Sequence, residues 1–163
     1  MADGLTITRA APGDEALVVA FVRELAEYEK LLHEAEATAS DFHAALFGEH
    51  PKVFCEIARW DGAPAGLALW FNNFSTFSGR HGIYLEDLYV RPAFRGRGIG
   101  KALISRLAAL CVEKKWSRMQ WSVLDWNAPS IAFYRGLGAE VLPDWRLCRV
   151  NGEALEALAA SAR

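Results

Sequence analysis

One short segment combines glycines and cations in a spacing that suits a phosphate group. It lies between an apolar segment typical of a strand and a periodic apolar segment typical of a helix. Glycines let the backbone approach a ligand closely, and a helix N-terminus presents N–H groups and a partial positive charge. The alternative is a glycine-rich turn with solubilising arginines. The candidate anion site consists of Arg95, Gly96, Arg97, Gly98, Ile99, Gly100 and Lys101.

Two common phosphate-loop patterns do not fit this segment. The dinucleotide fingerprint G-x-G-x-x-G needs a third glycine at position 101 or 103, and these positions hold Lys101 and Leu103. The Walker A pattern needs Ser or Thr after its Gly-Lys pair, where the chain has Ala102. What remains is an Arg-x-x-Gly-x-Gly pattern over residues 95–100.

That pattern resembles the pyrophosphate loop of the GNAT-superfamily acetyltransferases. Other motifs in the same order resemble one branch of that superfamily, the diamine acetyltransferases, which contains the spermidine/spermine N-acetyltransferases and the thialysine N-epsilon-acetyltransferases. These motifs are Phe47-Gly48-Glu49-His50-Pro51, Tyr84-Leu85-Glu86-Asp87, Asp125-Trp126-Asn127 and Phe133-Tyr134. The resemblance covers residues 6–150 and implies a homodimeric enzyme that acetylates the primary amine of a small molecule with acetyl-CoA, releasing coenzyme A.

Such a reaction needs a group that accepts a proton from the amine. An alkylamine has a pKa near ~10.4 and is protonated at neutral pH, and only the neutral form attacks a thioester. Glu86 and Asp87 are adjacent in an apolar strand segment. Neighbours on a strand face opposite sides, so we expect one of the two carboxylates to be partly buried. An ion pair with an arginine is the alternative role. The resemblance implies that Glu86 is the base, acting through an ordered water, and leaves Asp87 as structural.

The departing thiolate needs a proton donor, and Tyr134 is the candidate. Ile131, Tyr134 and Leu137 form an apolar stripe, so the residues alone favour a core aromatic. The resemblance implies that its hydroxyl lies near the coenzyme A sulfur and acts as the general acid.

The resemblance also implies how the rest of both substrates is held. The strand over residues 83–90 would diverge from a strand over residues 118–123, with the pantetheine arm between them. The implied cofactor contacts are backbone groups of Leu88, Tyr89 and Val90, one N–H of which would hold the oxyanion, together with Asn127, Ser130 and Tyr134. The implied amine contacts are Tyr28, Glu29 and Glu86.

Residues 73–80 depart from the polyamine enzymes, which carry an acid and a tryptophan in this segment. Here the segment has neither and includes Arg80. Asp125, preceded by Val123 and Leu124, resembles the thialysine-type enzymes. We therefore expect thialysine, a lysine-like amine or a short diamine as substrate. The alternatives are a polyamine acetyltransferase, a non-catalytic acyl-CoA-binding module and the acetylation of a protein amine.

The elements that must position these residues follow from periodicity and turn signals. Strands are expected at residues 5–9, 53–60, 63–71, 83–90, 118–123 and 146–150, with a polar loop over residues 72–82. Helices are expected after Pro12, over residues 40–47 with Ser40 as cap, after the glycine-rich loop, after Asn127, and after Asn151-Gly152. We expect one α/β domain over residues 1–163, with a mixed twisted sheet of about six or seven strands and helices on both faces.

Composition excludes several other classes. The net charge is −2, which provides no basic surface for nucleic acid. The apolar runs are far shorter than the ~18 residues of a membrane span, and no signal peptide is visible. Three scattered cysteines without a CxxC pair indicate a reduced, cytoplasmic protein. Four histidines without ligand spacing predict no metal.

Overall fold

The computed structural model describes residues 4–162, which fall into two units, residues 4–122 and residues 123–162. The first unit contains one sheet with the strand order β1-β2-β3-β4-β5. Its strands are β1 (Leu5–Arg9), β2 (Val53–Trp60), β3 (Ala63–Ser75), β4 (Arg80–Val90) and β5 (Met119–Gln120). The first four strands are antiparallel neighbours, and β5 runs parallel to β4.

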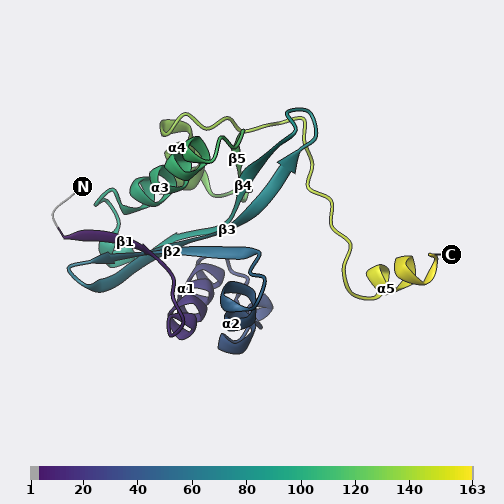
Figure 1. Ribbon diagram of the computed structural model, residues 1–163, viewed down its shortest axis with the longest axis horizontal. Helices are drawn as coiled ribbons and strands as arrows, with labels where there is room; N and C mark the ends of the chain where they lie inside the picture. The colour runs from purple at the N-terminus through teal and green to yellow at the C-terminus, as the bar shows by residue number, and fades with distance from the viewer. Residues whose placement is uncertain (1–3, 163) are drawn as a thin grey trace. The chain divides into compact units, whose positions relative to one another are not determined.

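Helices cover both faces of this sheet. The helices α1 (Glu15–Tyr28) and α2 (Ala39–Phe47) lie on one face, and α3 (Ile99–Glu113) lies on the other (Figure 1). Short 3₁₀ turns follow α1 at Leu32–Glu34 and precede α3 at Pro92–Phe94. The expected α/β architecture with a mixed sheet is confirmed.

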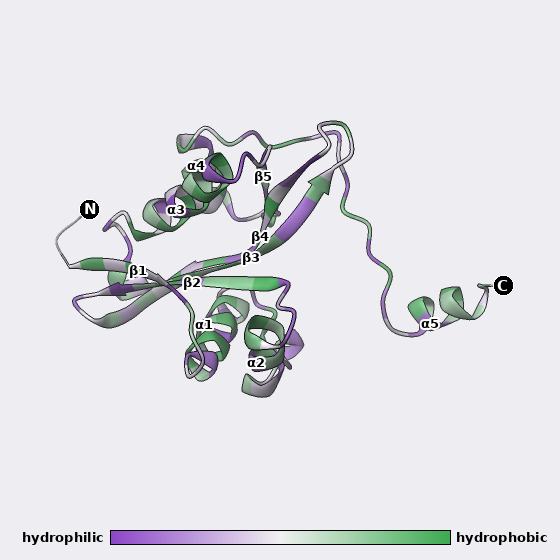
Figure 2. Cartoon of the chain, in the orientation of Figure 1, coloured by the Kyte–Doolittle hydropathy of each residue, from purple (hydrophilic) through white to green (hydrophobic). Residues whose placement is uncertain are grey.

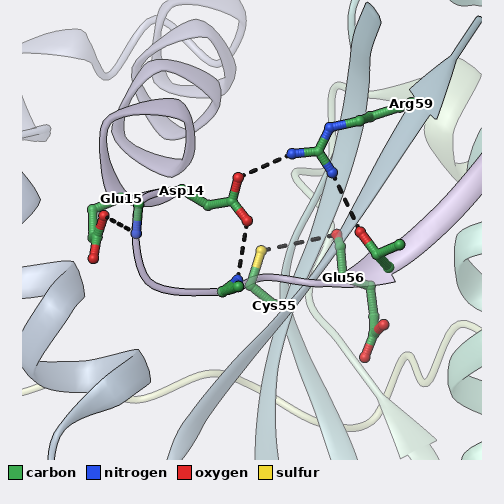
Figure 3. Close-up of polar contacts among 8 residues, drawn as sticks. Asp14, Glu15, Cys55, Glu56 and Arg59 are labelled. Atoms are coloured by element: carbon green, nitrogen blue, oxygen red, sulfur yellow. Dashed lines mark hydrogen bonds and ion pairs between the residues drawn. The ribbon is translucent and has the colours of Figure 1, made fainter. Parts of the chain in front are cut away.

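Side chains of α1, α2, β2, β3 and β4 form the core on the first face. Phe21 and Val18 of α1 are fully buried against Leu67 of β3 and Tyr89 of β4. Figure 2 shows the start of β2 coloured as apolar, whereas polar segments interrupt the far part of the β3–β4 hairpin. The start of α1 is fixed by Asp14, which accepts from the Arg59 guanidinium at 2.9 Å (Figure 3). These contacts hold the first half of α1 against the sheet.

The sheet has five strands in the described residues, fewer than the expected six or seven. The expected strand over residues 118–123 shrinks to β5, because only Met119 and Gln120 pair with β4. The expected strand over residues 146–150 is not a strand, and its residues are exposed. A period-two pattern does not make a strand without a neighbouring edge to pair with.

The polar loop expected over residues 72–82 is instead the end of a long hairpin. Four rungs join β3 to β4 there, from Asn72–Ile83 to Ser75–Arg80. The amide nitrogen of Asn73 donates to the side-chain oxygen of Gln120 at 2.8 Å, which links β3 to β5 across β4. Cross-strand pairing therefore overrides the loop-like composition of this segment.

Helix ends also differ from expectation. The N-cap of α2 is Thr38, whose hydroxyl accepts from Asp41 N in a capping box, so Ser40 is not the cap. The helix α1 stops at Tyr28, because Lys30 adopts a left-handed φ of 64°.

The second unit contains α4 (Ala128–Gly136) and α5 (Gly152–Ala160). Both start where expected, α4 after Asn127 and α5 after Asn151. No helix among residues 4–162 is long and apolar enough to cross a membrane.

Candidate active site

The glycine-rich loop leads directly into α3. Gly96 and Gly98 have φ values of 77° and 78°, and Gly98 is the N-cap of the helix. A Cβ built on either glycine would meet no atom within 4 Å, so the loop backbone faces open space. The first N–H groups of α3, at Ile99, Gly100 and Lys101, lie beyond the reach of intrahelical acceptors. These groups, with the exposed Arg97 and Lys101 side chains, fit the charge and shape of a pyrophosphate.

The edge of β4 beside this loop is open over half its length. β5 pairs with β4 only at Ile83 and Tyr84, and no other strand of residues 4–162 pairs with that edge. The backbone of Leu88, Tyr89 and Val90 therefore lies on the part of β4 that β5 does not cover. The Val90 carbonyl accepts from Arg95 Nε at 2.9 Å. An unpaired strand edge is the feature that an extended, amide-containing pantetheine arm can hydrogen-bond to.

A β-bulge at Glu86 changes which carboxylates face the same side. Leu69 of β3 pairs with Asp87 and Trp70 pairs with Leu85, so Glu86 is the extra residue. Side chains alternate along a strand, so Glu86 lies on the same face as Tyr84, which is the face that carries α1. Asp87 pairs with Leu69, and Leu69 belongs to the core beneath α1. Asp87 therefore lies on that face as well. The expectation that Glu86 and Asp87 face opposite sides is wrong, because the bulge resets the alternation.

Burial divides these two acids. Glu86 is exposed, whereas Asp87 is partly buried. Burial, together with the smaller effect of the negative charges on Glu86 and Glu29, raises the pKa of Asp87 to about 6. Burial also raises the pKa of Glu29, the C-cap of α1. Tyr28, the last residue of α1, is 37% exposed. The structure thus gathers three carboxylates, Glu29, Glu86 and Asp87, in one acidic cluster.

The sequence did not predict that Glu86 and Asp87 lie on the same face of β4. The sequence shows that the two acids are adjacent. In a strand with regular alternation, however, adjacent side chains point to opposite faces. The bulge depends on the register between β3 and β4, and no local signal marks it.

The remaining candidates belong to the second unit. Asn127 is 6% exposed, and its side-chain oxygen accepts from Ser130 N at 3.3 Å, so the two residues meet in the N-cap of α4. Tyr134 is half-buried in the same helix, with its ring centroid 5.3 Å from that of Phe133. The structure brings Asn127 and Ser130 together, and it places Tyr134 one turn further along α4.

Comparison with known proteins adds independent findings. The family model described as "Acetyltransferase (GNAT) family" matches residues 18–139. The thialysine N-epsilon-acetyltransferase of Bos taurus is 38% identical, over 94% of this chain and 96% of its own length. The L-ornithine N5-acetyltransferase of Arabidopsis thaliana is 41% identical over 60% of this chain and 43% of its own length.

A solved structure has the same fold. An integron cassette protein from the mobile metagenome of V. cholerae superposes with a TM-score of 0.81 at 26% identity, covering 97% of this chain and 99% of its own. The open loop at the start of α3 and the sheet that supports it agree with the family match. The chain belongs to the acetyltransferase (GNAT) family and is an N-acetyltransferase that uses acetyl-CoA.

Proposed function

We propose that this enzyme acetylates the side-chain amine of a small, lysine-like amino acid, with thialysine as the leading candidate and short diamines as further substrates. The observation that carries the proposal is the acidic cluster of Glu29, Glu86 and Asp87 beside the open edge of β4. Three carboxylates in one place attract a single ammonium group and can accept its proton. The similarity to enzymes named for thialysine and L-ornithine supports the same substrate class.

Different residues would bind the cofactor and the amine. Acetyl-CoA, when bound, supplies an activated thioester. The backbone of the glycine-rich loop and the cations Arg97 and Lys101 would hold its pyrophosphate. Backbone groups of Leu88, Tyr89 and Val90 would hold the pantetheine arm, and one of their N–H groups would stabilise negative charge on the carbonyl oxygen.

Glu86 takes the proton from the ammonium group in this proposal, directly or through a water. Asp87 and Glu29 add negative charge to the same cluster, which attracts the ammonium group of the substrate. Tyr134 donates a proton to the thiolate, the role that the resemblance implies for it. Asn127 and Ser130 would contact the cofactor from the start of α4, and Tyr28 would contact the amine beside Glu29.

The surface beyond the acidic cluster argues for a short substrate. Tyr84 lies on the same face of β4 as Glu86, and it stacks on Phe71 with ring centroids 5.1 Å apart. This neighbouring surface is aromatic and uncharged. A long polycation would leave further ammonium groups without carboxylates there. Arg80 lies six residues from Glu86 along β4, roughly 20 Å at 3.3 Å per residue, so it is too distant to act on the reacting amine.

The test is kcat/KM for thialysine, lysine, L-ornithine, putrescine, spermidine, spermine and a lysine-containing peptide in one buffer. The amino acids should exceed spermine by at least ~10-fold, about 1.4 kcal/mol of transition-state discrimination. A spermidine or spermine preference of that size would assign the enzyme to polyamines instead, and a peptide preference would assign it to protein amines. Acetyl-CoA binding without turnover of any amine would indicate an acyl-CoA-binding module.

We also propose a homodimer, which rests on the resemblance alone. Light scattering should then give a mass twice that of the 18.0 kDa chain, and a monomer mass at micromolar concentration would contradict it. A cytoplasmic location is proposed from the three scattered cysteines without a CxxC pair.

A further inference from the structure

Arg95, the first residue of the glycine-rich loop, contacts the amine side of the site. Its guanidinium carbon lies 5.2 Å from the centroid of the Tyr28 ring and 5.8 Å from that of Tyr89. Its Nε donates to the Val90 carbonyl at 2.9 Å, which fixes the side chain to β4. The guanidinium is thus held among groups from α1 and β4.

The two aromatic partners of Arg95 border the acidic cluster. Tyr28 precedes Glu29 at the end of α1, and Tyr89 is two residues beyond Asp87 on the same face of β4. The electrons on the face of an aromatic ring attract a cation placed over it. Movement of Arg95 would therefore change the position of Tyr28, and with it the last turn of α1.

Arg97 provides a contrast within the same loop. Its guanidinium carbon lies 5.0 Å from the Trp60 ring centroid and 5.8 Å from that of Phe94. Trp60 ends β2, and Phe94 belongs to the turn before α3. Arg97 has the same charge as Arg95, and the aromatic rings it contacts lie outside the acidic cluster. It is therefore a matched control.

We propose that Arg95 is a positioning residue that couples cofactor binding to amine binding. The Nε bond to Val90 uses one of the five N–H donors of the guanidinium, and pyrophosphate oxygens can accept from the others. Bound pyrophosphate then holds Arg95 more firmly than the Val90 bond alone, and Arg95 in turn holds Tyr28 and the end of α1 more firmly. The amine consequently binds more tightly to the cofactor-loaded enzyme, and by reciprocity the amine tightens cofactor binding by the same factor. This inference rests on the proposed amine site at Tyr28 and Glu29.

Hydrogen exchange tests the coupling without any amine. Backbone amides of residues 25–31 should exchange at least ~3-fold more slowly when coenzyme A saturates the wild-type protein, because the end of α1 is then held more firmly. The Arg95→Met variant should lose this protection at saturating coenzyme A. The Arg97→Met variant should bind coenzyme A more weakly but keep the protection once saturated. Absence of protection in the wild type, or its survival in Arg95→Met, would overturn the inference.

A second variant separates charge from shape. Arg95→Lys keeps the positive charge but lacks the planar fork that bonds Val90 and stacks on Tyr28. It should retain coenzyme A affinity within about 3-fold and still lose the protection of residues 25–31. Protection equal to that of the wild type would show that charge alone suffices, and it would refute the positioning role.

Calorimetry then measures the coupling to the amine. Thialysine should bind the wild-type protein ~5-fold or more tightly with coenzyme A present than without it, within the usual range of coupling between sites. The ratio should fall to about 1 in Arg95→Met and remain in Arg97→Met. Equal ratios in both variants would refute the inference. An enzyme that turns over no amine while residues 25–31 are still protected would instead refute the proposed function and leave the role of Arg95 in place.

Discussion

At the scale of single residues, Glu86 and Asp87 differ in their exposure to solvent. Glu86 is exposed and can meet a substrate, whereas Asp87 on the same face is partly buried, with a pKa raised to about 6. Glu86 is therefore the acid that a substrate can reach, and Asp87 is the acid whose charge changes near neutral pH.

Replacing Glu86 with glutamine should remove the proton acceptor at the bulge while keeping its size. The value of kcat should fall by ~100-fold to ~10,000-fold near neutral pH. It should recover in part at high pH, where solution supplies more neutral amine. Steady-state rates across pH measure this, with coenzyme A affinity as the control for an intact cofactor site. A wild-type rate at every pH would remove Glu86 from the mechanism.

Replacing Asp87 with asparagine should change how stability depends on pH. The pKa of Asp87 rises from 3.8 to about 6 on folding, so the folded state binds more protons between these values. Protonated Asp87 therefore stabilises the folded wild type at low pH, and this contribution is lost as the pH rises through about 6. The free energy of unfolding of Asp87→Asn, relative to the wild type, should increase by about 3 kcal/mol between pH 3 and pH 8. Urea denaturation across this range provides the measurement, and a constant difference would contradict the burial of a titrating Asp87.

At the scale of elements, an ion pair between a buried carboxylate and a partly exposed arginine joins β1 to β2 beneath α3. Glu56 of β2 is 1% exposed, and Arg9 of β1 lies 2.8 Å from one of its carboxylate oxygens. Arg106 of α3 lies 3.9 Å from the other oxygen and is more exposed than Arg9. The short contact to Arg9 therefore offsets part of the cost of burying the Glu56 charge.

The two arginines should therefore differ in their contribution to stability. Arg9→Met leaves a buried carboxylate without its close partner and should lower the free energy of unfolding by about 1–3 kcal/mol. Arg106→Met removes a longer and more exposed contact and should cost less than about 1 kcal/mol. Chemical denaturation of both variants tests this. Equal losses would mean that Arg9 is not the main partner of Glu56.

At the scale of the whole molecule, cofactor binding should stabilise the folded state through the loop at α3. Coenzyme A at 100 times its Kd should raise the free energy of unfolding by about 2.7 kcal/mol. Pantetheine at the same concentration should raise it much less, because it lacks the pyrophosphate. Thermal unfolding with each ligand compares them, and equal stabilisation would contradict a pyrophosphate site in residues 95–101.

A loop variant serves as the control for that comparison. Gly100→Val adds a side chain in the first turn of α3 and should reduce the stabilisation by coenzyme A. Gly98 is unsuited to this substitution, because its φ of 78° is strained for valine. A full response in Gly100→Val would mean that the backbone of this turn does not approach the ligand.

Much of the fold and part of the candidate site could be predicted because the signals are local. The Asp61-Gly62 hairpin has Asp61 and Gly62 at φ values of 48° and 82°, the conformation that this dipeptide favours. The start of α3 follows from glycines that must adopt positive φ. The strand predicted over residues 118–123 is shorter in the structure, and the segment 146–150 is not a strand. Strand formation depends on a neighbouring strand edge, which the sequence does not reveal.

The loop of residues 95–101 and the helix that follows it could be predicted from the sequence alone, because residue type and spacing encode local backbone conformation. The ordered motifs also indicated the family by their resemblance to known enzymes. The shared face of Glu86 and Asp87 emerged only from the folded sheet, since the bulge arises from the register of β4 against β3. The tertiary structure also decided that Arg95 reaches Tyr28 across more than sixty residues of chain. Both are contacts between distant segments, and their geometry depends on how the sheet and α1 pack rather than on neighbouring residues.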